Sequence, residues 1–104
     1  MIQKSYQVLI FPKAELDLIE TKDYFTEVLK TSSTRIFDRL LEIIDQLESN
    51  PMIFPLVRDQ TLREKGYRFV PVDNFILFYV VIDTTKTVEI RRFLYGRRKY
   101  TSIL

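Results

Sequence analysis

The stretch Phe75–Ile82 constrains the fold more than any other part of the chain, because its only polar side-chain atom is the hydroxyl of Tyr79. Apolar residues on both faces of a short run are typical of a strand in the middle of a sheet, covered above and below. Neighbouring strands and covering layers must come from the remaining sequence. With 104 residues there is room for one core, so the chain is expected to form a single domain, 1–104.

Two further strands are predicted in the same half of the chain, at Tyr67–Val72 and Thr87–Leu94. The joints Asp73-Asn74 and Asp83–Lys86 contain the residues that tight hairpin turns favour. Pro71 cannot donate a backbone hydrogen bond, which assigns its position to an edge, a bulge or a strand end. The C-terminal half is therefore predicted to form a three-strand meander.

The N-terminal half begins with a predicted strand at Tyr6–Phe11, whose apolar side chains on both faces indicate that it is buried on two faces or paired internally. Pro12 can open a helix, and a first helix is predicted over residues 13–30. Its acidic residues lie mainly in its first half, Asp17 among them, where they suit the positive end of the helix dipole. The residues that approach helical spacing are Ala14, Leu18, Phe25, Val28 and Leu29.

A second helix is predicted over residues 34–48 from the clearest amphipathic pattern in the chain. It should end before Asn50-Pro51, because the residue before a proline is pushed out of the helical region. The break at Thr31–Ser33 is short, so the two helices are predicted to form an antiparallel hairpin. The apolar stripe of the second helix consists of Ile36, Leu40, Ile43, Ile44 and Leu47, widened by Phe37 and Leu41.

The predicted fold class is α+β: a small antiparallel-rich sheet, made of the N-terminal strand and the C-terminal three-strand meander, with the N-terminal α-helical hairpin packed on one face. The segment Pro51–Leu62 has no sustained period and is expected to be a connector. The other face of the sheet is expected to be only partly covered, which would leave it open to a partner or substrate. The residues predicted between hairpin and sheet are Leu40, Ile44, Leu47, Leu77 and Tyr79.

Charge is distributed unevenly along the chain. Residues 1–50 carry six Lys/Arg and nine Asp/Glu, a balance of −3, whereas residues 51–104 carry ten and five, a balance of +5. Such a difference between halves indicates an anionic partner, most simply nucleic acid. The alternative is that cations near a sheet edge only keep that edge soluble and unpaired.

The densest charge lies at the C-terminus. A strand-like run ends at Tyr95 and is followed by Gly96, by three consecutive cations at Arg97–Lys99, and by Tyr100. The final Ile103-Leu104 is expected to dock on the body of the protein, because it adds two apolar side chains at the end of the chain. The cationic cluster is therefore expected to be held in place.

Composition removes most enzyme classes. The sequence has no cysteine and no histidine, so disulfides, thiolate chemistry, a zinc site and a Ser-His or Cys-His nucleophile pair are excluded. Two glycines are too few for the glycine-rich loops that bind nucleotide phosphates. No metal or cofactor is expected, and the absence of a long apolar run or signal-peptide pattern predicts a cytoplasmic protein without membrane contact.

The order of the predicted elements, together with four local patterns, resembles the RelE/ParE superfamily of bacterial toxins. The patterns are Asn50-Pro51, Tyr67–Val70, Phe75–Val81 and, above all, Arg91–Tyr100, in which a strand runs into Gly-Arg-Arg. The resemblance covers nearly the whole chain. It implies a growth-inhibiting toxin of a type II toxin–antitoxin pair, with a role in plasmid stabilisation, that is neutralised by a small cognate antitoxin.

Two activities occur in the superfamily. RelE-like members enter the ribosome and cleave mRNA, whereas ParE-like members poison DNA gyrase and cut nothing themselves. If this chain were RelE-like, the resemblance implies catalytic roles for Arg68, Arg97, Arg98 and Tyr100, because RNA cleavage needs cations on the phosphate and groups that transfer protons. The residues expected to bind nucleic acid or another target are Tyr95, Arg91, Arg92, Lys99 and Lys65.

Two departures weaken the mRNA-cleaving alternative. Ile76 occupies a strand position where the cleaving toxins have arginine, and Tyr95 stands where relatives often have histidine. Arg91 and Arg92 are adjacent on a strand, so their side chains are expected to point to opposite faces. The favoured function is a ParE-like gyrase poison; the alternatives are a ribosome-dependent mRNA endonuclease and a non-toxic module that binds nucleic acid or protein.

Overall fold

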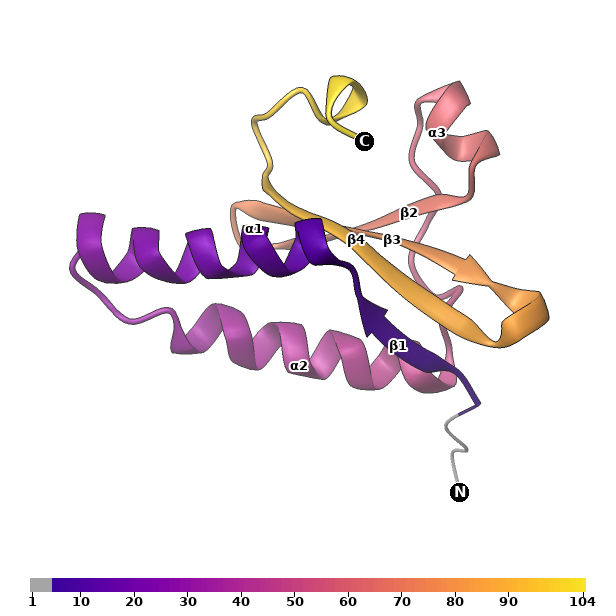
Figure 1. The fold of residues 1–104 in the computed structure, drawn as a ribbon, viewed down its shortest axis with the longest axis horizontal. Coiled ribbons are helices and arrows are strands. Elements are labelled where there is room, and N and C mark those ends of the chain that lie inside the picture. The colour runs from indigo at the N-terminus through magenta and orange to yellow at the C-terminus, as the bar shows by residue number, and fades with distance from the viewer. Residues whose placement is uncertain (1–4) are drawn as a thin grey trace.

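The computed structural model of the protein describes residues 5–104 (Figure 1). Its strands are β1 (Gln7–Ile10), β2 (Tyr67–Val72), β3 (Phe75–Ile82) and β4 (Thr87–Tyr95), and its α-helices are α1 (Pro12–Asp23), α2 (Thr34–Ser49) and α3 (Gln60–Glu64). A π-helical turn, Tyr24–Val28, extends α1, and short 3₁₀ turns lie at Asp83–Thr85 and Tyr100–Ser102. Every predicted helix and strand is present, and α3 is the one α-helix that was not predicted.

The four strands form one sheet in the order β1-β4-β3-β2. Strands β2, β3 and β4 are the predicted antiparallel meander, with β3 in the interior. Strand β1 pairs parallel to β4, with Val8 opposite Val88, and the helices supply the crossover that a parallel pairing requires. The predicted α+β fold is confirmed, and Pro71 lies on the edge strand β2.

Of the two alternatives for the first strand, burial on both faces is wrong, and pairing within the sheet is confirmed. Strand β1 is only four residues long and lies at the edge of the sheet, where the covering elements end. Leu9 and Ile10 are 40% and 43% exposed as a result. Apolar side chains on both faces of a short run therefore do not distinguish an edge strand from a central one.

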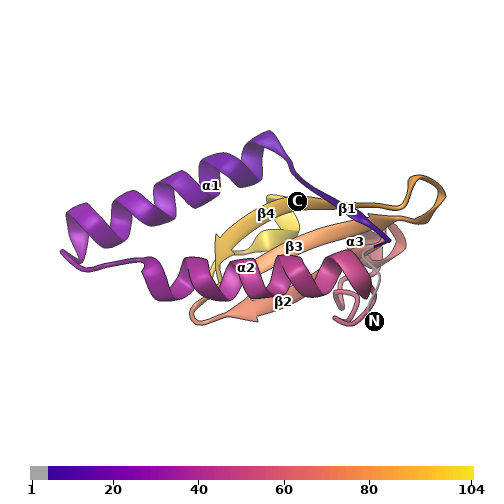
Figure 2. The same cartoon turned by 90° about the horizontal axis from the view of Figure 1, so that it is seen from below.

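Helices α1 and α2 run in opposite directions across one face of the sheet (Figures 1 and 2), and residues 12–49 are called the helical layer below. Four of the five predicted core residues are buried, namely Leu40, Leu47, Leu77 and Tyr79. Ile44 is only half-buried, because Ile43 takes the inward position on that turn of α2. Leu41, which was expected to widen the apolar stripe, is exposed.

The end of the first helix departs from the prediction. A hydrogen bond from the Leu29 amide to the Tyr24 carbonyl closes a π-helical turn over five residues instead of four. This extra residue changes the direction in which the following side chains point. Val28 and Leu29 are consequently 64% and 46% exposed, although their spacing predicted burial.

The second face of the sheet is covered by two segments that are far apart in sequence. They are residues 55–66, which include α3, and the C-terminal tail, residues 96–104, and both lie on the side of the sheet away from α2 (Figure 1). Together they are called the second cover below. The core beneath it is formed by Val57, Leu62, Tyr67, Phe78, Val80 and Leu94, with Ile103 and Leu104 packed against it.

The second cover confirms one expectation and corrects another. The C-terminal tail is docked, as predicted, through Ile103 and Leu104. The second face is not the open surface that was expected, because the tail and α3 close most of it. Helix α3 escaped prediction because it has only five residues, and its strongest local signal is Asp59, whose carboxylate accepts a hydrogen bond from the Leu62 amide at 3.0 Å.

The connector that follows α2 is held to the sheet by two side-chain hydrogen bonds. Tyr79 donates to the Pro51 carbonyl and Arg68 donates to the Phe54 carbonyl, each at 2.7 Å. Burial raises the pKa of the Tyr79 phenol to about 12. The two hydrogen bonds hold the backbone of the connector against the sheet. The connector joins the helical layer to the second cover.

Strand β4 contains a β-bulge. Arg91 has no partner on β3, because the register shifts between Phe78 and Tyr79. Residues three apart on a regular strand point to opposite faces, yet Ile90 and Phe93 both pack under the helical layer. The extra residue at Arg91 makes this possible, and it keeps the second half of β4 in phase with the core.

Candidate functional site

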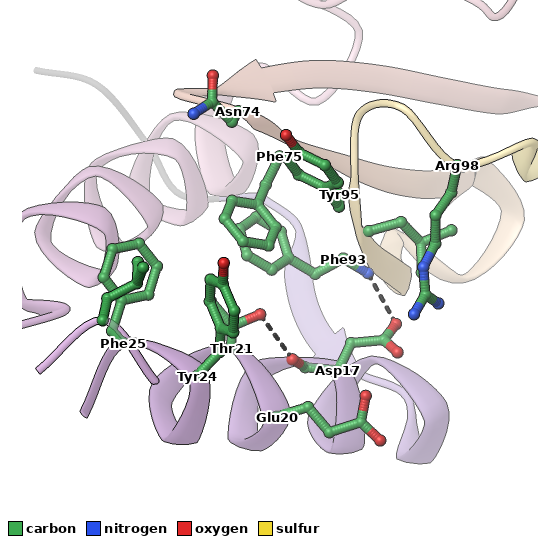
Figure 3. Close-up of a pocket in the computed structure, with 12 residues that line it drawn as sticks. Asp17, Glu20, Thr21, Tyr24, Phe25, Asn74, Phe75, Phe93, Tyr95 and Arg98 are labelled. Atoms are coloured by element: carbon green, nitrogen blue, oxygen red, sulfur yellow. Dashed lines mark hydrogen bonds between the residues drawn. The ribbon is translucent and has the colours of Figure 1, made fainter. Parts of the chain in front are cut away.

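A groove of about 540 Å³ lies between the helical layer and the ends of two strands (Figure 3). One wall comes from α1 and its π-helical turn, and the other comes from the β2–β3 turn, the end of β4 and the loop that follows. Its lining consists of Asp17, Glu20, Thr21, Tyr24, Phe25, Leu29, Asn74, Phe75, Phe93, Leu94, Tyr95 and Arg98.

Aromatic rings form the floor of the groove. The rings of Phe75 and Phe93 are stacked, with centroids 5.1 Å apart and planes 9° apart. Tyr95 meets Phe75 edge-on at 5.8 Å, and Phe25 approaches Phe75 from the helical side at 6.3 Å. Because Phe93 is buried and Tyr95 is 44% exposed, the floor rises from the core to the surface. It offers an apolar surface to a partner side chain.

A buried ion pair fixes the helical wall. The Asp17 carboxylate accepts hydrogen bonds from Arg92 Nε at 2.7 Å, from Arg92 Nη2 at 2.9 Å and from the Phe93 amide at 2.9 Å. The hydrogen bond to Asp17 is the main cause that raises the pKa of Arg92 above its ordinary value. Thr21 completes this wall by donating to the Asp17 carbonyl at 2.8 Å. The pair attaches α1 to β4 and determines the width of the groove.

The opposite wall is fixed by Gly96. Its amide donates to the Asn74 carbonyl at 2.8 Å, so the end of β4 is attached to the β2–β3 turn. A side chain at this position would place its Cβ 3.2 Å from the same carbonyl oxygen, so the turn would have to shift by a few tenths of an ångström to admit it. The Arg98 amide then donates to the Tyr95 carbonyl at 3.0 Å, and the Arg98 side chain extends toward the wall formed by α1 (Figure 3).

Three of the predicted site residues are brought together at this strand end. Tyr95 and Arg98 line the groove, and Tyr95 and Arg97 line an adjoining hollow of about 380 Å³ beside the β2–β3 turn. The Tyr95 side chain therefore separates the two hollows. A partner that occupied the groove would contact two members of this group and lie beside the third.

Arg91 and Arg92 do not point to opposite faces as expected. Both line one hollow of about 400 Å³, because the bulge breaks the alternation of side chains along β4. Arg91 forms an ion pair with Glu89 at 2.6 Å and donates to the Tyr67 hydroxyl at 3.1 Å. Both arginines have partners within the chain, so their role in binding a target stays a prediction.

The remaining residues assigned to RNA cleavage are not assembled. Arg68 lies opposite Tyr79 on the face under the helical layer, about 13 Å along β3 from the groove end at about 3.3 Å per residue. Tyr100 lies on the other face, where its ring packs on Phe78 with centroids 4.9 Å apart. Lys65 and Lys99 are exposed on the second cover. The sheet therefore separates Arg68 from Tyr100.

Sequence reasoning missed Asp17 and Phe75 as site residues. Asp17 was assigned to the helix dipole, although Ala14, Asp17 and Thr21 follow one another at helical spacing and form the buried stripe of α1. A carboxylate on such a stripe requires a cationic partner, which was the available signal. Phe75 was treated only as the start of the central strand, and nothing in its sequence context indicates the groove.

Among residues 5–104 no cluster of three His, Cys, Asp or Glu side chains could hold a metal ion. Over the same residues, no helix combines the length and apolar character needed to cross a bilayer.

The chemistry of the groove follows from its rings and its few charged side chains. Within the groove, Asp17 is neutralised by Arg92, and Glu20 and Arg98 leave no net charge. The groove therefore offers an apolar aromatic floor between two oppositely charged walls.

One family model matches most of the chain, and solved structures share its fold. A family model described as the ParE toxin of the type II toxin-antitoxin system parDE matches residues 8–100. The fold is similar to a chain of the RelBE2 toxin-antitoxin complex from Mycobacterium tuberculosis, with TM-score 0.64, 20% identity, and 88% of this chain and 98% of that chain covered.

Two further solved structures share the fold. A chain of the chromosomal ParDE system from P. aeruginosa has TM-score 0.66 and 15% identity, covering 89% of this chain and 98% of that chain. A chain of the archaeal RelE-RelB complex from Pyrococcus horikoshii OT3 has TM-score 0.57 and 16% identity, covering 90% and 98% respectively. No curated protein matches the sequence.

Proposed function

This chain belongs to the family of ParE toxins of type II toxin–antitoxin systems, and on that premise we propose that it inhibits bacterial growth by poisoning DNA gyrase. It acts in the cytoplasm and is silenced there by a small cognate antitoxin. It does not cleave nucleic acid itself.

The observation that carries this proposal is the separation of Arg68 from Tyr100 by the sheet. RNA cleavage requires cations and a proton-transferring group around one phosphate, within about 3 Å of the reacting atoms. Arg97 and Arg98 are adjacent, but Arg68 lies under the helical layer and Tyr100 packs on the opposite face. Ile76, where the cleaving toxins have arginine, packs against the core of the second face. These positions support a toxin that binds its target without cutting RNA.

We propose that the antitoxin binds in the groove. Tyr24 and Leu29 at its mouth are each 46% exposed, and Leu16 and Ile19 on the outer side of α1 are 59% and 50% exposed. Exposed apolar side chains that are contiguous with a hollow mark an interaction surface. Because Tyr95 and Arg98 line the same groove, an occupant would cover part of the strand-end group. The antitoxin would then neutralise the toxin by covering these residues.

Parallel assays test the activity. Purified toxin is added to a gyrase supercoiling reaction and to a coupled translation reaction, with Arg97→Ala/Arg98→Ala as the impaired variant and Lys22→Ala/Lys30→Ala as a control for loss of charge. We expect gyrase-cut DNA to accumulate with the wild type and the control, less of it with the impaired variant, and mRNA to stay intact. Ribosome-dependent mRNA cleavage that the impaired variant lacks would replace this proposal with the endonuclease alternative.

A third result has its own meaning. If neither assay responds and induced expression leaves growth undiminished with soluble protein present, the chain is a binding module without toxicity.

Antitoxin binding is tested separately with the small protein encoded by the adjoining gene. Tyr24→Asp/Leu29→Asp should weaken binding by at least about tenfold, since an interface centre tolerates little change. The matched control Leu41→Asp/Met52→Asp, on exposed apolar residues outside the groove, should not; equal losses would contradict the groove assignment.

A further inference from the structure

The second cover concentrates positive charge on one side of the molecule. Residues 55–66 and 96–104 carry six Lys/Arg and two Asp/Glu, a side-chain balance of +4. The helical layer, residues 12–49, carries five Lys/Arg and nine Asp/Glu, a balance of −4. Because these layers lie on opposite faces of the sheet, the charge is polarised across the sheet and not only along the chain (Figure 1).

The cations of the second cover are exposed and form no ion pair with any of residues 5–104. They are Arg58, Arg63, Lys65, Arg97 and Lys99, with Arg98 at the border of the groove. Within residues 5–104 the chain pairs other cations, as Arg92 does with Asp17 at 2.7 Å. The two acidic side chains of the second cover form hydrogen bonds at α3 instead. Asp59 caps this helix, and Glu64 accepts a hydrogen bond from Gln60 at 2.9 Å. The charge of this surface is therefore available to an external anion.

The second cover also lacks exposed aromatic rings. Tyr67 is buried beneath it, and Tyr100 is half-buried against Phe78. The two exposed aromatic residues of the described chain, Tyr24 and Tyr95, line the groove. Proteins that hold single-stranded nucleic acid stack bases on exposed rings, whereas contacts to a duplex backbone need only suitably placed cations. The surface chemistry therefore matches a duplex.

We propose that the second cover binds the phosphate backbone of duplex DNA without reading its sequence. The choice of DNA rests on the proposed function, since gyrase acts on duplex DNA and a poison bound to it would lie beside that DNA. The toxin would then contact the DNA and the enzyme at once. About five phosphate contacts predict that log Kobs falls with log salt concentration with a slope of about −4.5.

The test measures binding of the wild-type protein to a labelled duplex of about 20 base pairs by fluorescence anisotropy, without gyrase, between about 50 and 200 mM salt. The variants are Arg58→Gln/Arg63→Gln, on the segment that contains α3, and Arg97→Gln/Lys99→Gln, on the tail. Each should weaken binding by about fivefold or more and reduce the magnitude of the salt slope by about 2. Lys22→Gln/Lys30→Gln removes the same charge from the helical layer and should change affinity less than about twofold.

Three results would overturn the proposal: no binding by the wild type at about 50 mM salt, an α3-segment variant that behaves like the control, or tighter binding to a single-stranded RNA of equal length. The gyrase assay distinguishes this inference from the proposed function. DNA binding without gyrase poisoning contradicts the proposed function and leaves the surface assignment standing. Gyrase poisoning without DNA binding contradicts this inference alone.

Discussion

The helical layer and the second cover shield opposite faces of the same sheet by different means. The helical layer uses a continuous apolar stripe on α2 and a buried ion pair from α1. The second cover uses separate anchors: Leu62 from a five-residue helix, Tyr100 on Phe78, and two apolar residues at the end of the tail. A regular apolar stripe on a helix buries apolar surface through many similar contacts. Where only a few separate apolar side chains contact the sheet, the residues between them stay exposed and can be charged. This is why the side that is less regular also carries the net positive charge.

The largest effect is expected from Asp17→Ala, which removes the carboxylate that attaches the helical layer to β4. Loss of one partner of a buried pair leaves an uncompensated charge on Arg92 and costs about 3 to 5 kcal/mol. Urea denaturation measures the loss, with exposed Asp23→Ala on the same helix as the control. Asp17→Leu/Arg92→Met should recover part of it, because an apolar pair leaves no unmatched charge. Similar stability of Asp17→Ala and the control would show that the pair does not hold the layer.

Leu77→Ala is expected to cost about 2 to 5 kcal/mol, because it leaves a cavity in the core under α2. Ile103→Ala should cost less than about 1 kcal/mol, because that side chain is half-buried on the second cover and the tail can settle around it. Thermal unfolding of the two variants measures the contrast directly. Equal losses would mean that the tail is as integral to stability as the helical layer.

Stability at alkaline pH tests the burial of Tyr79, which binds the connector between the helical layer and the second cover. The pKa of the Tyr79 phenol is raised from an ordinary 10.0 to about 12 by burial, so the folded protein favours the neutral phenol. That contribution, on the order of a few kcal/mol, is fully present below pH 10 and is lost as the pH rises through about 12. The unfolding free energy of wild type should therefore fall more steeply over this range than that of Tyr79→Phe. Parallel curves for the two proteins would contradict the assignment.

A small effect on global stability is expected from Tyr100→Ala. Removing the ring that packs on Phe78 should lower global stability by about 1 kcal/mol, since an aromatic pair contributes on that order. Amide hydrogen exchange should nevertheless rise along residues 97–104, because the tail opens locally without unfolding the sheet. Unchanged exchange in the tail would show that Ile103 and Leu104 hold it without help from the ring.

The regular parts of the fold could be predicted because hydrophobic periodicity is a local signal. The stripe from Ile36 to Leu47 located α2, and the unbroken apolar run of β3 located an interior strand. Periodicity failed where one residue is added to an element. The π-helical turn exposes Val28, and the bulge at Arg91 alters the faces of β4, yet neither insertion leaves a mark in the pattern.

The candidate site could be predicted only at its strand end. Tyr95, Arg97 and Arg98 are close in sequence, so their proximity in space was expected. Asp17 lies 75 residues from the arginine it pairs with, and a single sequence carries no information on that distance in space. Arg68 and Tyr100 were grouped by resemblance alone, and the face on which each lies depends on strand register, which the sequence did not supply.

The bulge at Arg91 also bears on how the gene can change length. Side chains alternate along a strand, so the loss of one codon elsewhere in β4 would turn the residues beyond it to the wrong face. Loss of the Arg91 codon would instead produce a regular strand in which Ile90 and Phe93, now two positions apart, still face the same core. Homologous genes that differ by one codon in this strand should therefore carry the insertion or deletion at this position.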